Sequence, residues 1–111
     1  MNEREAYEML KIDYPEISEL IVYFSEYETY ENCTTNYVLD TYIEYSTSDK
    51  LLKLIDSIDQ LLQKYLDNQE SLNVICEAVT FNYYYYIEFE SGAALLNYIR
   101  TYLVEKLKTK K

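Results

Sequence analysis

Two glutamates, Glu88 and Glu90, lie beside aromatic residues in the segment from Asn82 to Glu90. Glycosidases use a pair of carboxylic acids as their catalytic residues, and neighbouring aromatic rings could stack on a sugar. Such an enzyme needs a cleft, however, and a small domain with one glycine and one proline offers little room for one. We therefore expect no catalysis from this pair.

The chain also lacks the residues that other catalytic and metal-binding sites need. The chain has no histidine, which removes the usual acid/base group near neutral pH, the Ser-His and Cys-His pairs and all imidazole ligands. Its single glycine, Gly92, forms no glycine-rich loop for a phosphate, and no segment matches an EF-hand. Cys33 and Cys76 are too far apart for a zinc knuckle or a redox pair, so each is expected to be a lone thiol. The sequence predicts no enzyme, no cofactor and no metal site.

Negative charge is concentrated in the first half of the chain. The 111 residues carry a formal net charge of −10, and the stretch 12–49 contains no lysine or arginine. Charges this dense repel one another, so they indicate either a solvated surface or a basic partner. A basic face for nucleic acid is missing, so direct binding to DNA or RNA is not expected. The acids of this stretch are Asp13, Glu16, Glu19, Glu26, Glu28, Glu31, Asp40, Glu44 and Asp49.

Tyrosine is interleaved with these acids. The chain has 15 tyrosines and 3 phenylalanines, and not every hydroxyl of so many tyrosines can be buried with a partner. Tyr42, Tyr65 and Tyr102 lie on or near apolar stripes and are expected in the core. Other tyrosines should be exposed, and tyrosine is enriched where proteins bind one another. The predicted partner-binding residues are Glu26, Tyr27, Glu28, Tyr30, Glu31, Asp40, Glu44, Tyr84, Tyr86 and Glu88.

Helices must position these residues, because apolar side chains recur at helical spacing along most of the chain. Ser48, Asn68 and Ser91 are suitable N-caps, and Pro15 suits the first turn of a helix. The segment 82–90 favours extended backbone, so we expect a short extended Tyr-rich connector there. The predicted fold is all-α, a compact bundle of about five helices in a single domain spanning 1–111. Helices are expected at 16–27, 36–45, 49–66, 69–79 and 92–108.

The first residues show neither the basic nor the apolar region of a signal peptide. No apolar run approaches the length of a membrane span. We expect a cytoplasmic protein with no membrane partner.

The whole pattern resembles the immunity proteins of bacterial contact-dependent growth inhibition systems. The resemblance rests on Tyr14-Pro15-Glu16-Ile17 entering a helix, on the acidic and aromatic segment from Glu26 to Glu44, on the central run from Leu51 to Leu62, and on the closing helix from Leu95 to Leu107. It implies a cytoplasmic protein that binds one cognate toxin domain tightly, often a nuclease, and blocks its active site or an adjacent surface.

A second hypothesis follows from the charge alone. A surface crowded with carboxylates resembles a phosphate backbone to a protein that holds nucleic acid, so the chain could be an acidic nucleic-acid mimic or regulator of such proteins. A mimic should bind several nucleic-acid-binding proteins, whereas an immunity protein should bind only its cognate toxin.

Overall fold

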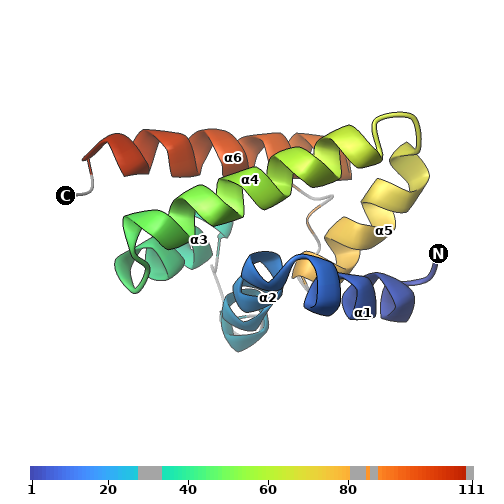
Figure 1. Cartoon of the computed structure of the whole chain (residues 1–111), viewed down its shortest axis with the longest axis horizontal. Helices are drawn as coiled ribbons and strands as arrows, with labels where there is room; N and C mark the ends of the chain where they lie inside the picture. Colours follow the sequence, from blue (N-terminus) through green and yellow to red (C-terminus); the bar gives the residue numbers. More distant parts are fainter. Residues whose placement is uncertain (28–33, 81–84, 86–87, 110–111) are drawn as a thin grey trace.

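A computed structural model gives the arrangement of the chain and describes residues 1–27, 34–80, 85 and 88–109, the side chain of Tyr27 excepted (Figure 1). Every regular element of this part is a helix, so the predicted all-α class is confirmed. These described residues form six α-helices where about five were expected. They are α1 (Glu3–Asp13), α2 (Pro15–Tyr27), α3 (Thr35–Glu44), α4 (Ser48–Lys64), α5 (Gln69–Thr80) and α6 (Gly92–Thr109).

The additional helix is α1, which the apolar spacing did not predict. It buries only Ala6 and Leu10, too few residues for a clear apolar stripe. Its start is nevertheless well capped, because the Asn2 side chain accepts from the Glu5 N–H at 2.8 Å while the Glu5 carboxylate accepts from the Asn2 N–H at 3.2 Å. This reciprocal capping box was the signal in the sequence.

Local capping interactions begin the other helices close to the predicted residues. Asn68 accepts from the Ser71 N–H, and Ser91 accepts from the Ala94 N–H, as predicted. The N-cap of α4 is Thr47 and not Ser48, because the Thr47 hydroxyl accepts from the Lys50 N–H at 3.2 Å. The prediction was wrong by one residue, since both hydroxyl side chains are chemically suited to the position.

The core lies where the apolar stripes of the helices meet. Helix α4 lies beside α6 and also packs on α2, while α5 contacts α6, α1 and α2 (Figure 1). Arg100 of α6 donates to the Asp59 carboxylate of α4, which adds a surface ion pair between these two helices. Tyr42 is fully buried, and Tyr65 and Tyr102 are partly buried against the core, as expected. The largest fully buried side chains include Phe24, Leu10, Ile17, Leu20, Leu39, Leu51, Leu54, Ile58, Leu61, Leu72 and Ile75.

The expected extended connector at 82–90 falls mostly outside the described residues. Its described residues, Tyr85 and 88–90, form a turn, since the N–H groups of Glu88 and Phe89 both donate to the Tyr85 carbonyl. The expectation of extended backbone is therefore wrong at these positions. Burial of Tyr85, whose hydroxyl donates to the Asn73 carbonyl at 3.1 Å, accounts for the difference.

Helix α6 begins in close contact with α5 at Gly92. The Gly92 N–H donates to Asn73 Oδ1 at 2.7 Å, and the Cys76 thiol donates to the Gly92 carbonyl at 3.3 Å. A Cβ at this position would lie 2.9 Å from both Cys76 Sγ and the Leu72 carbonyl oxygen. Only glycine therefore permits this approach of the two helices.

We predict that Gly92→Ala lowers the free energy of unfolding by about 1–3 kcal/mol, because the added methyl group overfills the α5–α6 contact. Alanine would stabilise an ordinary helical position relative to glycine, so the steric effect has the opposite sign to helix propensity. Urea denaturation of both proteins measures the change. Asn97→Ala, at an exposed position of α6, is the control and should change stability by less than about 0.5 kcal/mol.

Among the described tyrosines, the most deeply buried one has a hydroxyl whose hydrogen bonding is incomplete. The Tyr42 hydroxyl has no hydrogen-bond partner within the described ranges, and the nearby Ser46 hydroxyl donates to the Tyr42 carbonyl instead. Burial, assisted by the charge of Glu19, raises the pKa of Tyr42 to about 12. The ring meets Tyr23 edge to face, with 5.2 Å between centroids. The ring thus packs well, and burial of the hydroxyl outweighs the lowering effect of the nearby Ser46 hydroxyl on its pKa.

Tyr42→Phe should leave stability at neutral pH unchanged or raise it by up to about 1 kcal/mol, because it removes an unpaired buried hydroxyl and keeps the ring. The pKa of Tyr42 is higher in the folded state than its ordinary value of 10.0, so the wild-type protein loses stability as the pH rises from 10.0 to about 12. The variant should show a shallower loss. Urea denaturation across this pH range tests both points, and a clear destabilisation at neutral pH would show that the hydroxyl has a partner.

Candidate protein interface

The outer face of α2 carries a regular set of residues. Glu19, Val22, Tyr23 and Glu26 follow one another at helical spacing, on the side away from the buried Ile17, Leu20, Ile21 and Phe24. Val22 is 58% exposed although it is aliphatic, and Glu26 is exposed as well. This face combines carboxylates with uncovered apolar surface.

Helix α3 presents two rows of side chains beside its buried face. Asn36 and Asp40 face α6, where they accept hydrogen bonds from Tyr98 and Tyr102 respectively. Thr41 and Tyr45 lie on the other row, toward α2, and Tyr45 is 71% exposed. The packing of α3 between α2 and α6 therefore decides which of its polar residues remain available.

A groove opens between α2 and α3. Its volume is about 510 Å³, and we call it the α2–α3 groove. One of its carboxylates, Glu19, is paired with Lys50 at 3.0 Å, whereas Glu26 makes no ion pair with any described residue. The groove therefore keeps a net negative charge next to aromatic surface. Its described lining is Glu19, Val22, Tyr23, Glu26, Thr41 and Tyr45.

The predicted partner-binding residues are distributed unevenly relative to this groove. Glu26 lines it, and Glu44 is exposed on α3 one residue before Tyr45. Tyr27 is the last residue of α2, and Glu88 is exposed in the turn after Tyr85. The other predicted positions lie outside the described residues; they are Glu28, Tyr30, Glu31, Tyr84 and Tyr86.

Asp40 differs from the other predicted acids because it already has a partner within the fold. Its carboxylate accepts from the Tyr102 hydroxyl, whose pKa is raised to about 12 by partial burial and by Asp40. The Tyr102 ring stacks on Tyr98 at 6.0 Å, and the Lys106 ammonium lies 5.2 Å from its centroid on the same helix. Asp40 therefore helps to hold α3 on α6, whatever else it contacts.

The sequence interpretation missed most of the groove. Glu19, Val22 and Tyr23 share one helix face with Glu26, and this spacing could have identified them. Thr41 and Tyr45 could not be assigned to the same site, because their approach to α2 depends on how two helices pack.

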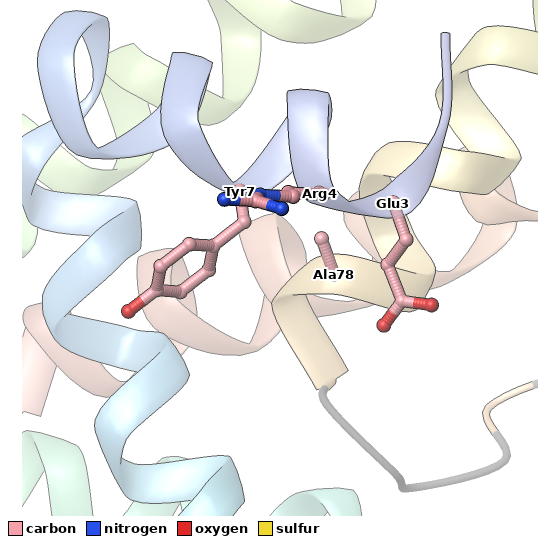
Figure 2. A pocket seen from close by; sticks show the side chains of 4 residues that line it. All are labelled: Glu3, Arg4, Tyr7 and Ala78. Atoms are coloured by element: carbon pink, nitrogen blue, oxygen red, sulfur yellow. The ribbon is translucent and has the colours of Figure 1, made fainter.

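A second hollow lies between α1 and α5, with a volume of about 400 Å³. Figure 2 shows Glu3, Arg4 and Tyr7 projecting from α1 beside Ala78 of α5. One cation and one carboxylate balance each other here, so this hollow lacks the net negative charge of the α2–α3 groove.

The described residues provide no evident catalytic or metal-binding centre. No group of three or more Cys, Asp or Glu side chains could hold a metal ion in this part of the chain. Cys76 is a free, buried thiol, and burial raises its pKa, which disfavours the reactive thiolate. Cys33 lies outside the described residues. None of the described helices is both long and apolar enough to cross a bilayer.

Comparison of the chain with protein families, curated proteins and solved structures finds no match. The resemblance to immunity proteins therefore depends on the residue pattern alone.

We predict that Asp40→Ala lowers the free energy of unfolding by about 1 kcal/mol, because the Tyr102 hydroxyl loses its charged acceptor. Glu44→Ala is the matched control, since it removes an acid one turn further along α3 that has no hydrogen bond or ion pair with the described residues. Its effect should be below about 0.5 kcal/mol. Equal effects of the two substitutions in thermal or urea denaturation would contradict a structural role for Asp40.

Proposed function

We propose that this chain is an immunity protein that binds and neutralises a cognate toxin domain, with a nuclease as the favoured class of toxin. The observation that carries the proposal is the α2–α3 groove, where exposed Val22 and Tyr45 lie beside the carboxylates of Glu19 and Glu26. The groove belongs to the stretch 12–49, which has no basic residue. Such a surface is suited to a basic protein partner.

Binding would proceed through two kinds of interaction. The acidic field of the first half of the chain accelerates the approach of a basic toxin, which is the usual effect of complementary charge at an interface. Exposed Tyr45 and Val22 then supply contacts that exclude water and slow dissociation. Charge at the rim therefore controls association, and the aromatic contacts control residence time.

Neutralisation requires no catalysis by this chain. A nuclease binds a phosphate backbone with basic side chains. Carboxylates of an inhibitor can form ion pairs with the same basic side chains. The immunity protein would thus cover the active site or a surface next to it. The cognate toxin would be the C-terminal domain of a large exported protein encoded beside this chain, as the resemblance implies.

The direct test is to co-express this chain with the C-terminal domain of the upstream-encoded protein and to measure cell survival. Purified proteins would then be mixed across a salt series to measure association and dissociation rates. Rescue together with a complex whose association slows in salt supports the proposal. Absence of both rescue and complex contradicts it, and binding to several unrelated nucleic-acid-binding proteins would favour the mimic hypothesis.

The double charge reversal Glu26→Lys with Glu44→Lys should reduce the association rate about tenfold or more and weaken its salt dependence. Both side chains are exposed, so the variant should fold normally. Asp67→Lys with Glu70→Lys, in the turn after α4 and in the first turn of α5, changes the net charge equally and serves as the control. Identical losses in both variants would mean that net charge alone matters and that the interface lies elsewhere.

A further inference from the structure

We propose that the α2–α3 groove receives one arginine side chain of the partner. The inference rests on the proposed function, because it specifies the residue that a basic partner inserts into this groove. It goes further than general charge attraction, since it predicts a preference between two side chains of equal charge.

The groove offers the chemical groups that a guanidinium needs. The α2 wall contributes the carboxylates of Glu19 and Glu26 and the side chains of Val22 and Tyr23. The α3 wall adds the Tyr45 ring and the Thr41 hydroxyl; that hydroxyl donates to the Tyr37 carbonyl at 2.9 Å and so keeps its oxygen available as an acceptor. The groove has a volume of about 510 Å³, which is room enough for one arginine side chain.

The occupation of Glu19 indicates where the guanidinium lies. Lys50 Nζ is 3.0 Å from Glu19, so this wall already holds one cation, which comes from the chain itself. Glu26 lines the same groove, is exposed, and has no ion pair with a described residue. Glu26 therefore offers the incoming cation a carboxylate that no described lysine or arginine already holds.

The aromatic lining favours arginine over lysine. A planar guanidinium can stack on a tyrosine ring while it donates two hydrogen bonds to one carboxylate, whereas an ammonium is more strongly hydrated and acts as a point charge. Tyr45 is 71% exposed, and Val22 is 58% exposed, so an aromatic face and an aliphatic surface are uncovered. Val22 can pack on the methylene stem of an arginine, as apolar surface does on long basic side chains.

The experiment titrates the isotopically labelled protein with Nα-acetyl-arginine methylamide and, separately, with its lysine counterpart, and follows backbone amide resonances by NMR. We expect the arginine compound to shift resonances of Glu19 to Glu26 and of Thr41 to Tyr45. Its dissociation constant should be about threefold lower than that of the lysine compound, the gain expected from stacking on an exposed aromatic ring. Equal constants for the two compounds, or shifts confined to other helices, would overturn the inference.

Four variants separate the groove from general attraction. Glu26→Gln should weaken arginine binding about threefold or more by removing the open carboxylate. Tyr45→Ala should abolish the preference for arginine over lysine, while Tyr45→Phe should retain it because the ring remains. Asp67→Asn should change nothing, because the 17-residue helix α4, about 26 Å long, separates it from Tyr45. If Asp67→Asn weakens binding as much as Glu26→Gln, the attraction is nonspecific and the inference fails.

This test contains no toxin, so its result is distinct from that of the co-expression test. Rescue by the wild-type chain without an arginine preference would refute the groove inference alone. Arginine binding in the groove without rescue or complex formation would refute the immunity proposal and leave the site standing.

Discussion

The close approach of α5 and α6 at Gly92 is the contact on which the arrangement of the other helices depends. Asn73 and Cys76 hold the first residue of α6 through hydrogen bonds to its backbone, which a side chain at position 92 would obstruct. The direction of α6 is thereby set against α5 and α4. Tyr98 and Tyr102, further along α6, then hold Asn36 and Asp40 of α3. The position of α3 beside α2, and so the groove between them, follows from this series of contacts.

Negative charge places a second constraint on the molecule. The first half of the chain is strongly acidic, and few of its carboxylates have a basic partner among the described residues; the pairs Lys50–Glu19 and Lys11–Glu8 are the ion pairs seen there. Exposed pairs of this kind contribute little to stability. The buried apolar side chains, which form one cluster, therefore have to outweigh the repulsion between surface acids. Exposed acids such as Glu26 and Glu44 nevertheless have no ion pair among the described residues.

The tyrosines show how one residue type takes three structural roles. Tyr42 and Tyr85 are buried in the core, Tyr98 and Tyr102 join α6 to α3, and Tyr45 is exposed at the groove. The apolar stripe correctly placed Tyr42 inside. It could not distinguish Tyr45 from Tyr102, because both lie near the edge of a helix's apolar face and only the neighbouring helix decides whether an edge is covered.

The sequence by itself determined the all-α class, most of the helices, their inward faces and the concentration of acid in the first half. These properties depend on side-chain spacing and on caps within a few residues, which a linear pattern contains. The weakly apolar α1 was not predicted, because the spacing of its few apolar residues gave too little signal. Only the tertiary structure decided that Asp40 is bound by Tyr102 and that Tyr45 and Thr41 join Glu19, Val22, Tyr23 and Glu26 around one groove. The physical reason is that these contacts join different helices, 62 residues apart for Asp40 and Tyr102, and the order of residues along one helix does not specify its neighbours.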